Sequence, residues 1–405
     1  MIKSGTWEWW RITGALCLGS IMIFANLYVT QPLMPLLANE FSISPLKASY
    51  TLTSATLSLG LSLVFFGVIS DALGRRWLIL TSSFCAVLTT ALVTLVDNYE
   101  WLIALRIIQG VCLGGLPAVA VAYMAEEFEP KALISAIGLY VAANSLGGIS
   151  GRLLGGFFAE FLSWSHTFGA VAMLSIGLWL ILAILLPKQK HYTAKSFKLK
   201  GVGSDLFNHL KNTKLLPAYL LGGFNFFIFV NQFSFITFVL EAEPYHLSTK
   251  FLGALFLTYL AGTVASAISG KFGNRFGQPS CMAAGCILLM IGTGITLSES
   301  LYLIILGFLI SSFGFFFAHS NASSWVSQTA THSKASASSL YLLFYYVGAS
   351  TGGLYLNIFW QWNAWVGVVI GSLIMLSVTL ALALYLKLGT KHAANWGEKM
   401  LANSE

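Results

Sequence analysis

The chain has 405 residues, of which 57% are hydrophobic and 9% are charged, and its formal net charge is +7. A soluble domain carries roughly a quarter charged residues, so this composition excludes an ordinary soluble protein and favours a chain whose apolar surface is covered by lipid. The cations lie between apolar runs, without the interleaved aromatic residues of a nucleic-acid-binding stripe, so nucleic acid is excluded as a partner. The five cysteines lie inside apolar runs and form no C-x-x-C pair, so neither a disulfide framework nor a metal site is expected.

Apolar stretches long enough to span a membrane as helices recur along the whole chain. The first is too long for the core of a signal peptide and lacks a small-residue cleavage site, so we count it as a helix. Together the stretches predict an all-α integral membrane protein with twelve transmembrane helices. In chain order, the expected spans are 12–38, 48–69, 77–96, 101–125, 133–160, 166–187, 215–240, 250–270, 281–297, 301–326, 336–359 and 364–387.

Basic residues gather in alternate connections between the expected helices. Of the 22 Lys and Arg residues, only Lys47 and Lys250 lie in the opposite set of connections, and Arg106 and Arg152 lie inside helices. Connections rich in Lys and Arg stay on the cytoplasmic side of a membrane. We therefore expect both ends of the chain in the cytoplasm and the protein in a bacterial-type inner membrane.

The longest connection, 188–214, divides the chain near its midpoint into two sets of six helices. It is rich in lysine, and we interpret it as a cytoplasmic basic linker, with binding to anionic lipid headgroups as an alternative side role. The expected organisation is a six-helix bundle over 1–187, this linker, a second six-helix bundle over 215–387 and a cytoplasmic tail over 388–405.

The two halves share glycine patterns at corresponding places. The pattern G-x3-[DN]-x2-G occurs at 67–74, after the second expected span, and at 270–277, after the eighth. The pattern G-x3-G-G occurs at 151–156 in the fifth span and at 348–353 in the eleventh. Two matches at corresponding helices indicate parallel repeats, an architecture typical of secondary transporters.

Three segments carry a family resemblance. GVISDALGRRWLIL at 67–80 resembles the signature loop between helices 2 and 3 of the major facilitator superfamily, and RIIQGVCLGG at 106–115 is similar to the R-x-x-Q-G motif of its proton-coupled drug transporters. YVTQPLMPLLANEF at 28–41 is similar to the end of helix 1 in that group. On these segments the chain is identified as a member of the superfamily, similar over its whole length to the twelve-helix drug:proton antiporter group and its YnfM-like branch. The resemblance implies two six-helix bundles and transport by alternating access.

The resemblance also implies a conformational latch in the loop after the second span, made and broken between the two halves during transport. The alternative is a plain positive-inside anchor, although neither Asp71 nor Gly74 is needed for anchoring. Asn274 takes the place of the acidic residue in the second copy, so that copy is expected to be a weaker latch or none. The implied latch residues are Gly67, Asp71, Gly74, Arg75 and Arg76.

The fifth expected helix keeps the glycine spacing of the antiporter motif. Arg152 stands where that motif has proline, so the close-packing glycines remain while the proline kink is lost, which leaves the outward direction of transport open. Small residues four apart let another helix backbone approach closely in lipid. We expect this seam to pack against the matching face of the eleventh helix or its neighbours. The expected packing residues are Gly147, Gly151, Gly155, Gly348 and Gly352.

Arg106 and Arg152 lie deep in apolar helices, where a guanidinium costs about 2.5–3.5 kcal/mol or more unless it meets water or a partner. No Asp or Glu lies deep in any expected helix. Three kinds of partner remain open: backbone carbonyls and amides such as Gln109 or Asn144, an anionic group of the solute, or a carboxylate at the rim. On Coulomb grounds we expect the pathway to disfavour organic cations and to accept neutral, zwitterionic or anionic solutes.

Polar side chains inside expected helices 1, 4, 7 and 10 are the candidates for a solute-binding cavity, because the resemblance places these helices around the pathway. For any single residue, a hydrogen bond between helices is the alternative. His319 titrates in a useful range, but the residues alone identify no proton carrier. The cavity candidates in these helices are Arg106, Gln109, Asn26, Gln31, Asn231, Gln232, His319 and Asn321, and Arg152 of the fifth helix is added to them.

The function expected from these features is secondary active transport of a small organic solute across the cytoplasmic membrane, as proton-coupled efflux of a drug-like or metabolite compound. Uptake or facilitated transport of a neutral or anionic metabolite is the alternative, and a membrane-embedded enzyme is a distant one, because H-E-x-x-H, G-x-S-x-G and paired deep carboxylates do not occur. We expect no catalytic residue, no metal and no cofactor apart from the coupling proton. The expected partners are the solute and the lipid bilayer, with the monomer as the functional unit.

Overall fold

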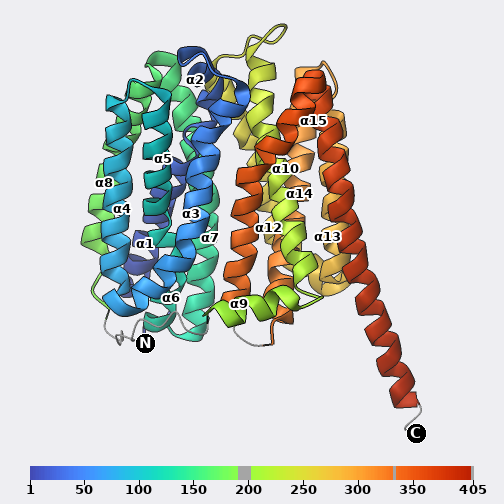
Figure 1. Ribbon diagram of the computed structural model, residues 1–405. Coiled ribbons are helices and arrows are strands. Elements are labelled where there is room, and N and C mark those ends of the chain that lie inside the picture. The colour runs from blue at the N-terminus through green and yellow to red at the C-terminus, as the bar shows by residue number, and fades with distance from the viewer. Residues whose placement is uncertain (190–201, 332–333, 403–405) are drawn as a thin grey trace. The chain divides into compact units, whose positions relative to one another are not determined.

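The computed structural model describes residues 1–189, 202–331 and 334–402, and these residues are almost entirely helical (Figure 1). They fall into two compact units. The first contains the described residues of 1–200 together with 233–257, and the second contains those of 201–232 and 258–405. The unit boundary therefore passes through two helices, between residues 232 and 233 and between residues 257 and 258. The domain boundaries expected from the sequence stay a prediction.

The first 189 residues of unit 1 form six membrane-length helical passes, several of which are broken into shorter helices. The helices of this part are α1 Trp7–Tyr28, η1 Gln31–Leu33, α2 Met34–Glu40, α3 Pro45–Leu73, α4 Arg75–Leu92, η2 Val93–Leu95, α5 Tyr99–Leu113, α6 Gly115–Glu127, α7 Pro130–Phe161 and α8 Trp164–Leu185. The first pass breaks after Tyr28, beside Pro32, and the fourth breaks at Gly114, three residues before Pro117. Proline has no N–H for the helical ladder, so both breaks fall where the ladder loses a donor.

The rest of the chain begins with a short helix inside the expected linker and continues with the remaining passes. The helices are α9 Val202–Lys211, α10 Leu216–Glu241, α11 Thr249–Ala254, η3 Leu255–Thr258, α12 Tyr259–Phe276, α13 Gln278–Ile295, α14 Leu301–Thr329 and α15 Lys334–Ala402. The long α15 contains a break at Asn363 and Ala364, whose backbone angles are not helical. It also continues through the expected tail.

The expected number of membrane spans agrees with the structure. Within the described ranges, 11 helices are long and apolar enough to cross a membrane, and the last of them, Ser336–Gly389, has 54 residues. Because the break at 363–364 divides it, it corresponds to the two expected spans 336–359 and 364–387. The prediction of an all-α membrane protein with twelve helices is confirmed.

Gly74 and Gly277 show the repeat directly in the backbone. Gly74 has φ +93° and ψ 137°, and Gly277 has φ +83° and ψ 136°. Each ends a helix, and each N–H donates to the carbonyl four residues earlier, that of Ser70 at 3.1 Å and that of Gly273 at 3.0 Å. Because glycine enters this region without a Cβ clash, the shared pattern at 67–74 and 270–277 encodes the same turn twice.

The glycine seam of α7 packs against α1, so the expected partner of this seam was wrong. A Cβ added at Gly147 would lie 2.8 Å from the Cα of Ile21, and one at Gly155 would lie 2.5 Å from the carbonyl oxygen of Val29. In unit 2, Gly348 and Gly352 make the equivalent approach to Gly223 and Phe227 of α10. Gly151 lies between Gly147 and Gly155 on the same seam, and a Cβ added there would overlap the Ala25 backbone.

This contact predicts a position-dependent effect of alanine along one helix. Gly151→Ala is expected to lower the free energy of unfolding by about 1–3 kcal/mol, because the Ala25 backbone must move. Gly138→Ala on the same helix is the matched control, since nothing lies within 4 Å of its added Cβ; it is expected to be neutral or to stabilise by up to about 1 kcal/mol. Thermal unfolding in detergent compares the two, and equal unfolding temperatures would contradict the seam.

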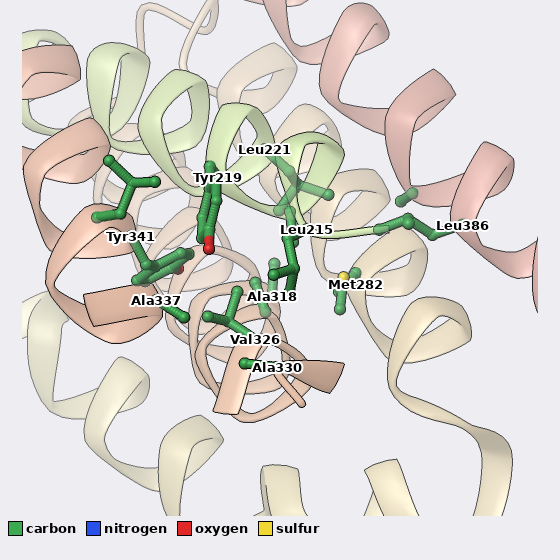
Figure 2. Packing of buried hydrophobic residues seen from close by; sticks show 14 of the residues in the cluster. Leu215, Tyr219, Leu221, Met282, Ala318, Val326, Ala330, Ala337, Tyr341 and Leu386 are labelled. Atoms are coloured by element: carbon green, nitrogen blue, oxygen red, sulfur yellow. The ribbon is translucent and has the colours of Figure 1, made fainter. Parts of the chain in front are cut away.

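The apolar core of unit 2 gathers where α10 begins, and Figure 2 shows it from close by. Leu215, just before α10, and Tyr219 in its first turn share this cluster with Val326 of α14 and Tyr341 of α15. Leu386, near the end of the last membrane pass, lies in the same cluster. Segments that are far apart in the sequence therefore meet in this cluster, in which Tyr341 is 1% exposed.

Candidate functional site

Arg106 is completely buried in unit 1 and is surrounded by oxygen acceptors. Its Nε donates to the carbonyl oxygen of Thr51 at 2.7 Å, its Nη2 to that of Leu27 at 2.7 Å, and its Nη1 to that of Asn26 at 3.1 Å. Its Nη1 also donates to Oε1 of Gln109, one helical turn further along α5. Asn26 and Leu27 belong to the last turn of α1, whose carbonyls lack helical donors, so Arg106 caps that broken helix.

The Arg106 cluster continues through side chains. Gln109 donates through Nε2 to Oγ1 of Thr90 at 2.6 Å, and Thr90 donates to Oδ1 of Asn26 at 2.7 Å. Asn26 in turn donates to Oγ of Ser175 in α8 at 2.8 Å. Of the three kinds of partner left open by the sequence, carbonyls and amides are the ones found at Arg106. Its role in binding solute stays a prediction.

Arg152 is 2% exposed and is held in a different way. Its Nε donates to Oε1 of Gln31 at 2.8 Å and its Nη1 to the carbonyl oxygen of Gly148 at 2.8 Å. Its guanidinium carbon lies 3.8 Å from the centre of the Tyr28 ring and 4.6 Å from that of Phe256, so both rings stabilise the cation. The Gly148 carbonyl is the one that a proline at position 152 would leave without its helical donor.

The segment 233–257 contacts the rest of unit 1 around Arg152. Gln31 donates through Nε2 to Oγ of Ser234 at 3.1 Å, and the ring of Phe256 belongs to the same segment. A Cβ added at Gly253 would lie 2.7 Å from the carbonyl oxygen of Arg152. The segment is therefore held to η1 and α7 by a guanidinium, an amide and close backbone packing.

The implied latch loop is described in part. Arg75 donates to Oε1 of Glu126 through Nη2 at 2.7 Å and through Nε at 3.0 Å, and through Nη1 to Oγ of Ser70 at 2.9 Å. Arg76 donates to the carbonyl oxygens of Leu186 at 2.7 Å and Ala183 at 3.1 Å, at the end of α8. The side chain of Asp71 lies outside the described residues, and an added Cβ at Gly67 would have nothing within 4 Å. The latch role stays a prediction.

Two partners of Arg75 were not identified from the sequence. Glu126 binds Arg75, and Gln189 joins the pair: it accepts from the backbone N–H of Arg75 at 3.2 Å and donates to Oε2 of Glu126 at 2.5 Å. The sequence does contain a signal for Glu126. This residue directly follows the fourth expected span, which ends on the same side of the membrane as the latch loop. The sequence offered none for Gln189, which is the second residue of the expected linker.

Two of the three amide candidates of unit 2 join one helix to another. Asn231 donates to the carbonyl oxygens of Phe227 at 2.9 Å and of Ala349 at 2.8 Å, and Gln232 donates to Oγ1 of Thr293 at 3.1 Å. Asn321 donates to the carbonyl oxygen of Phe317 within its own helix, at 2.8 Å. The bonds of Asn231 and Gln232 are of the kind given above as the alternative to solute binding, and the cavity role of these residues stays a prediction.

His319 lies in an aromatic cluster of unit 2 whose α15 members were not singled out from the sequence. Its Nδ1 is 2.8 Å from the hydroxyl of Tyr341, and its ring centre is 4.7 Å from that of Tyr345. Tyr345 stacks on Phe226 of α10 with ring centres 3.8 Å apart and an interplanar angle of 15°. The structure thus brings one cavity candidate together with aromatic residues of α10, α14 and α15.

Comparison with known proteins gives the family. The model of the Major Facilitator Superfamily matches residues 16–353. The uncharacterized MFS-type transporter YybF of Bacillus subtilis is 36% identical over 400 residues, which cover 99% of each chain. The inner membrane transport protein YnfM of Escherichia coli is 35% identical over 381 residues, covering 94% of this chain and 91% of that one. Among solved structures, the nucleoside transporter NupG superposes with a TM-score of 0.74 at 15% identity, covering 93% of this chain and 99% of the other. The chain belongs to the Major Facilitator Superfamily, and it is a multi-pass membrane transporter of small solutes and not an enzyme.

Proposed function

We propose that this transporter exports a small drug-like or metabolite solute across the inner membrane in exchange for protons. Both ends of the chain would then lie in the cytoplasm, as the distribution of Lys and Arg indicates. The name of the E. coli relative YnfM, an inner membrane transport protein, supports the choice of membrane. The transported solute is neutral, zwitterionic or anionic.

The observation that carries the proposal is the Arg106–Gln109 pair. These two residues are the fixed positions of the R-x-x-Q-G motif that resembles proton-coupled drug transporters, and they are hydrogen-bonded to each other in α5. The oxygens that accept from Arg106 belong to carbonyls and an amide, which carry no net charge. Its positive charge therefore acts on whatever enters the low-dielectric interior, and it repels an organic cation.

Uptake or facilitated transport of a neutral or anionic metabolite is the second candidate. Arg152 favours it, because this residue stands where the antiporter motif has proline and α7 runs unbroken through that position. The two candidates differ in what an imposed proton gradient does to the flux of the solute.

Proteoliposomes loaded with separate probes test the proposal. We expect a pH gradient to accelerate the exit of a neutral aromatic probe, chloramphenicol, or of an anionic one, benzoate, while the permanent cation ethidium moves no faster than in empty liposomes. If no transported probe responds to the gradient, proton antiport is wrong. Ethidium flux as large as that of the best neutral probe, and unchanged in Arg152→Ala, would overturn the charge preference.

A further inference from the structure

His319 is the one histidine that lies away from the ends of the expected membrane spans. It lies ten residues before Thr329, the last residue of α14, which corresponds to about 15 Å of helix. Histidine is the side chain whose charge ordinarily changes between about pH 5 and pH 8. The sequence places no Asp or Glu at comparable depth, so a proton that crosses this protein has few side chains to bind.

The geometry around His319 suits both protonation states of the ring. The hydroxyl oxygen of Tyr341 lies 2.8 Å from Nδ1 of His319 and 3.4 Å from the backbone carbonyl oxygen of the same residue. When the ring is neutral with Nδ1 unprotonated, the Tyr341 hydroxyl donates to Nδ1. When Nδ1 carries a proton, it donates to the hydroxyl oxygen, and the hydroxyl proton turns toward the carbonyl. Only hydrogens move between the two states.

Aromatic rings pack around His319. Phe315, one turn earlier in α14, has its ring centre 5.9 Å away at an interplanar angle of 12°, and Tyr345 has its ring centre 4.7 Å away. The faces of aromatic rings attract a cation, and the attraction grows where water is excluded. Tyr341 itself is fixed in the core of unit 2, so the partner oxygen is held in place (Figure 2).

The other ionisable groups on the elements that pack against α14 are accounted for by exposure, by hydrogen bonds or by their ionisation only at high pH. Lys271 and Arg275 lie exposed at the end of α12. In α13, Cys281 is buried and Cys286 is hydrogen-bonded to Asn225 and Thr379. The remaining ones near the site are tyrosine hydroxyls, which ionise only at high pH. They are Tyr219 of α10, Tyr259 of α12, and Tyr341, Tyr345 and Tyr346 of α15.

We propose that His319, with Tyr341 as its hydrogen-bond partner, is the site at which the transporter binds the coupled proton. The proposal rests on the proton-coupled function proposed above for its role in transport. The proton binds at Nδ1 and leaves from the same atom, while Tyr341 only reorients its hydroxyl. Tyr341 is therefore a positioning residue.

Ring-nitrogen NMR of the full chain, labelled with ¹⁵N at histidine, tests proton binding without any solute. The His319 signal is identified by its loss in His319→Gln, and we expect its ring nitrogens to change from the neutral to the protonated pattern as the pH is lowered. Tyr341→Phe is expected to move the midpoint of this change. The matched control is His166→Gln, because His166 is exposed and its Nδ1 lies 2.7 Å from the Ser163 hydroxyl. A His319 signal that does not titrate overturns the proposal.

Transport in proteoliposomes, with chloramphenicol as the probe, tests the coupling role. In His319→Gln the acceleration by an imposed pH gradient is expected to fall about tenfold or more, since the proton carrier is gone. Exchange of labelled for unlabelled chloramphenicol without a gradient is measured on the same variant, and a loss of gradient response that exceeds the loss of exchange assigns the effect to proton coupling. Both activities should persist in His166→Gln.

The outcomes separate this inference from the function on which it rests. If His319→Gln keeps the full gradient response, His319 is not the coupling site, while proton-coupled export still stands. If the unmodified protein shows no gradient response with a probe that it exchanges, the proposed function is wrong and the coupling role falls with it. The titration of His319 decides proton binding even if chloramphenicol is not carried.

Discussion

Arg106→Met is expected to lower the free energy of unfolding by about 3 kcal/mol and to abolish transport. Three backbone carbonyls and the Gln109 amide oxygen lose their donor in a site from which solvent is excluded. An orphaned buried acceptor costs about 1–3 kcal/mol, and partial relaxation keeps the total below the sum over the four. The end of α1 is also released, because Arg106 caps the carbonyls of Asn26 and Leu27. Thermal unfolding in detergent measures the loss.

Two further variants make this prediction specific. Arg106→Lys keeps the charge but replaces a planar group with donors in three directions by a single ammonium, so it is expected to recover only part of the stability. Arg275→Met is the control, because Arg275 is exposed at the end of α12 and its loss is expected to cost no more than about 0.5 kcal/mol. If Arg106→Met unfolds at the temperature of the unmodified protein, the carbonyls of Asn26, Leu27 and Thr51 have other donors and the capping role is wrong.

The features that could be predicted from the sequence are those written in its one-dimensional pattern. Apolar runs give the spans, and the break of α15 at Asn363 and Ala364 falls between the expected spans 336–359 and 364–387. The turns at Gly74 and Gly277 were also readable, because a conformation open mainly to glycine leaves glycine at the same place in both repeats. Such features depend on residues near one another in the chain.

The partners across helices could not be predicted in this way, because spacing gives a face of a helix without saying which helix meets it. The seam glycines of α7 have the spacing needed for close approach, yet nothing in 147–155 distinguishes α1 from the eleventh span as the partner. Burial of the arginines raises the same difficulty. Their depth followed from the sequence, but the carbonyls of Asn26 and Leu27 are available to Arg106 only because α1 breaks there.

Arg152, at the proline position of the antiporter motif, changes the helix locally and also contacts residues far away in the sequence. With arginine at this position, α7 stays continuous, and the added side chain returns to the Gly148 carbonyl and reaches Gln31. It also reaches Phe256, more than a hundred residues away in sequence. The arginine at the proline position thus also holds the segment 233–257 in unit 1. The chain continues into unit 2 at both ends of this segment.

A loosened segment 233–257 is therefore expected in Arg152→Ala. The variant loses the cation–π contact with Phe256, and Gln31, which bonds Ser234, loses the donor that orients it. Together these losses are worth about 1.5–2 kcal/mol, which is a tenfold or larger increase in the population of the detached form. A membrane-permeant maleimide measures this on a Ser234→Cys background in which the five native cysteines are replaced by serine, because Ser234 is 2% exposed and accepts from Gln31. Phe256→Leu removes one ring only and is expected to increase labelling about threefold. Arg152→Lys keeps a positive charge between the two rings, so its labelling rate is expected to lie between those of the unmodified protein and Arg152→Ala. If Arg152→Ala leaves the labelling rate unchanged, close packing at Gly253 alone holds the segment, and Arg152 has no part in holding it.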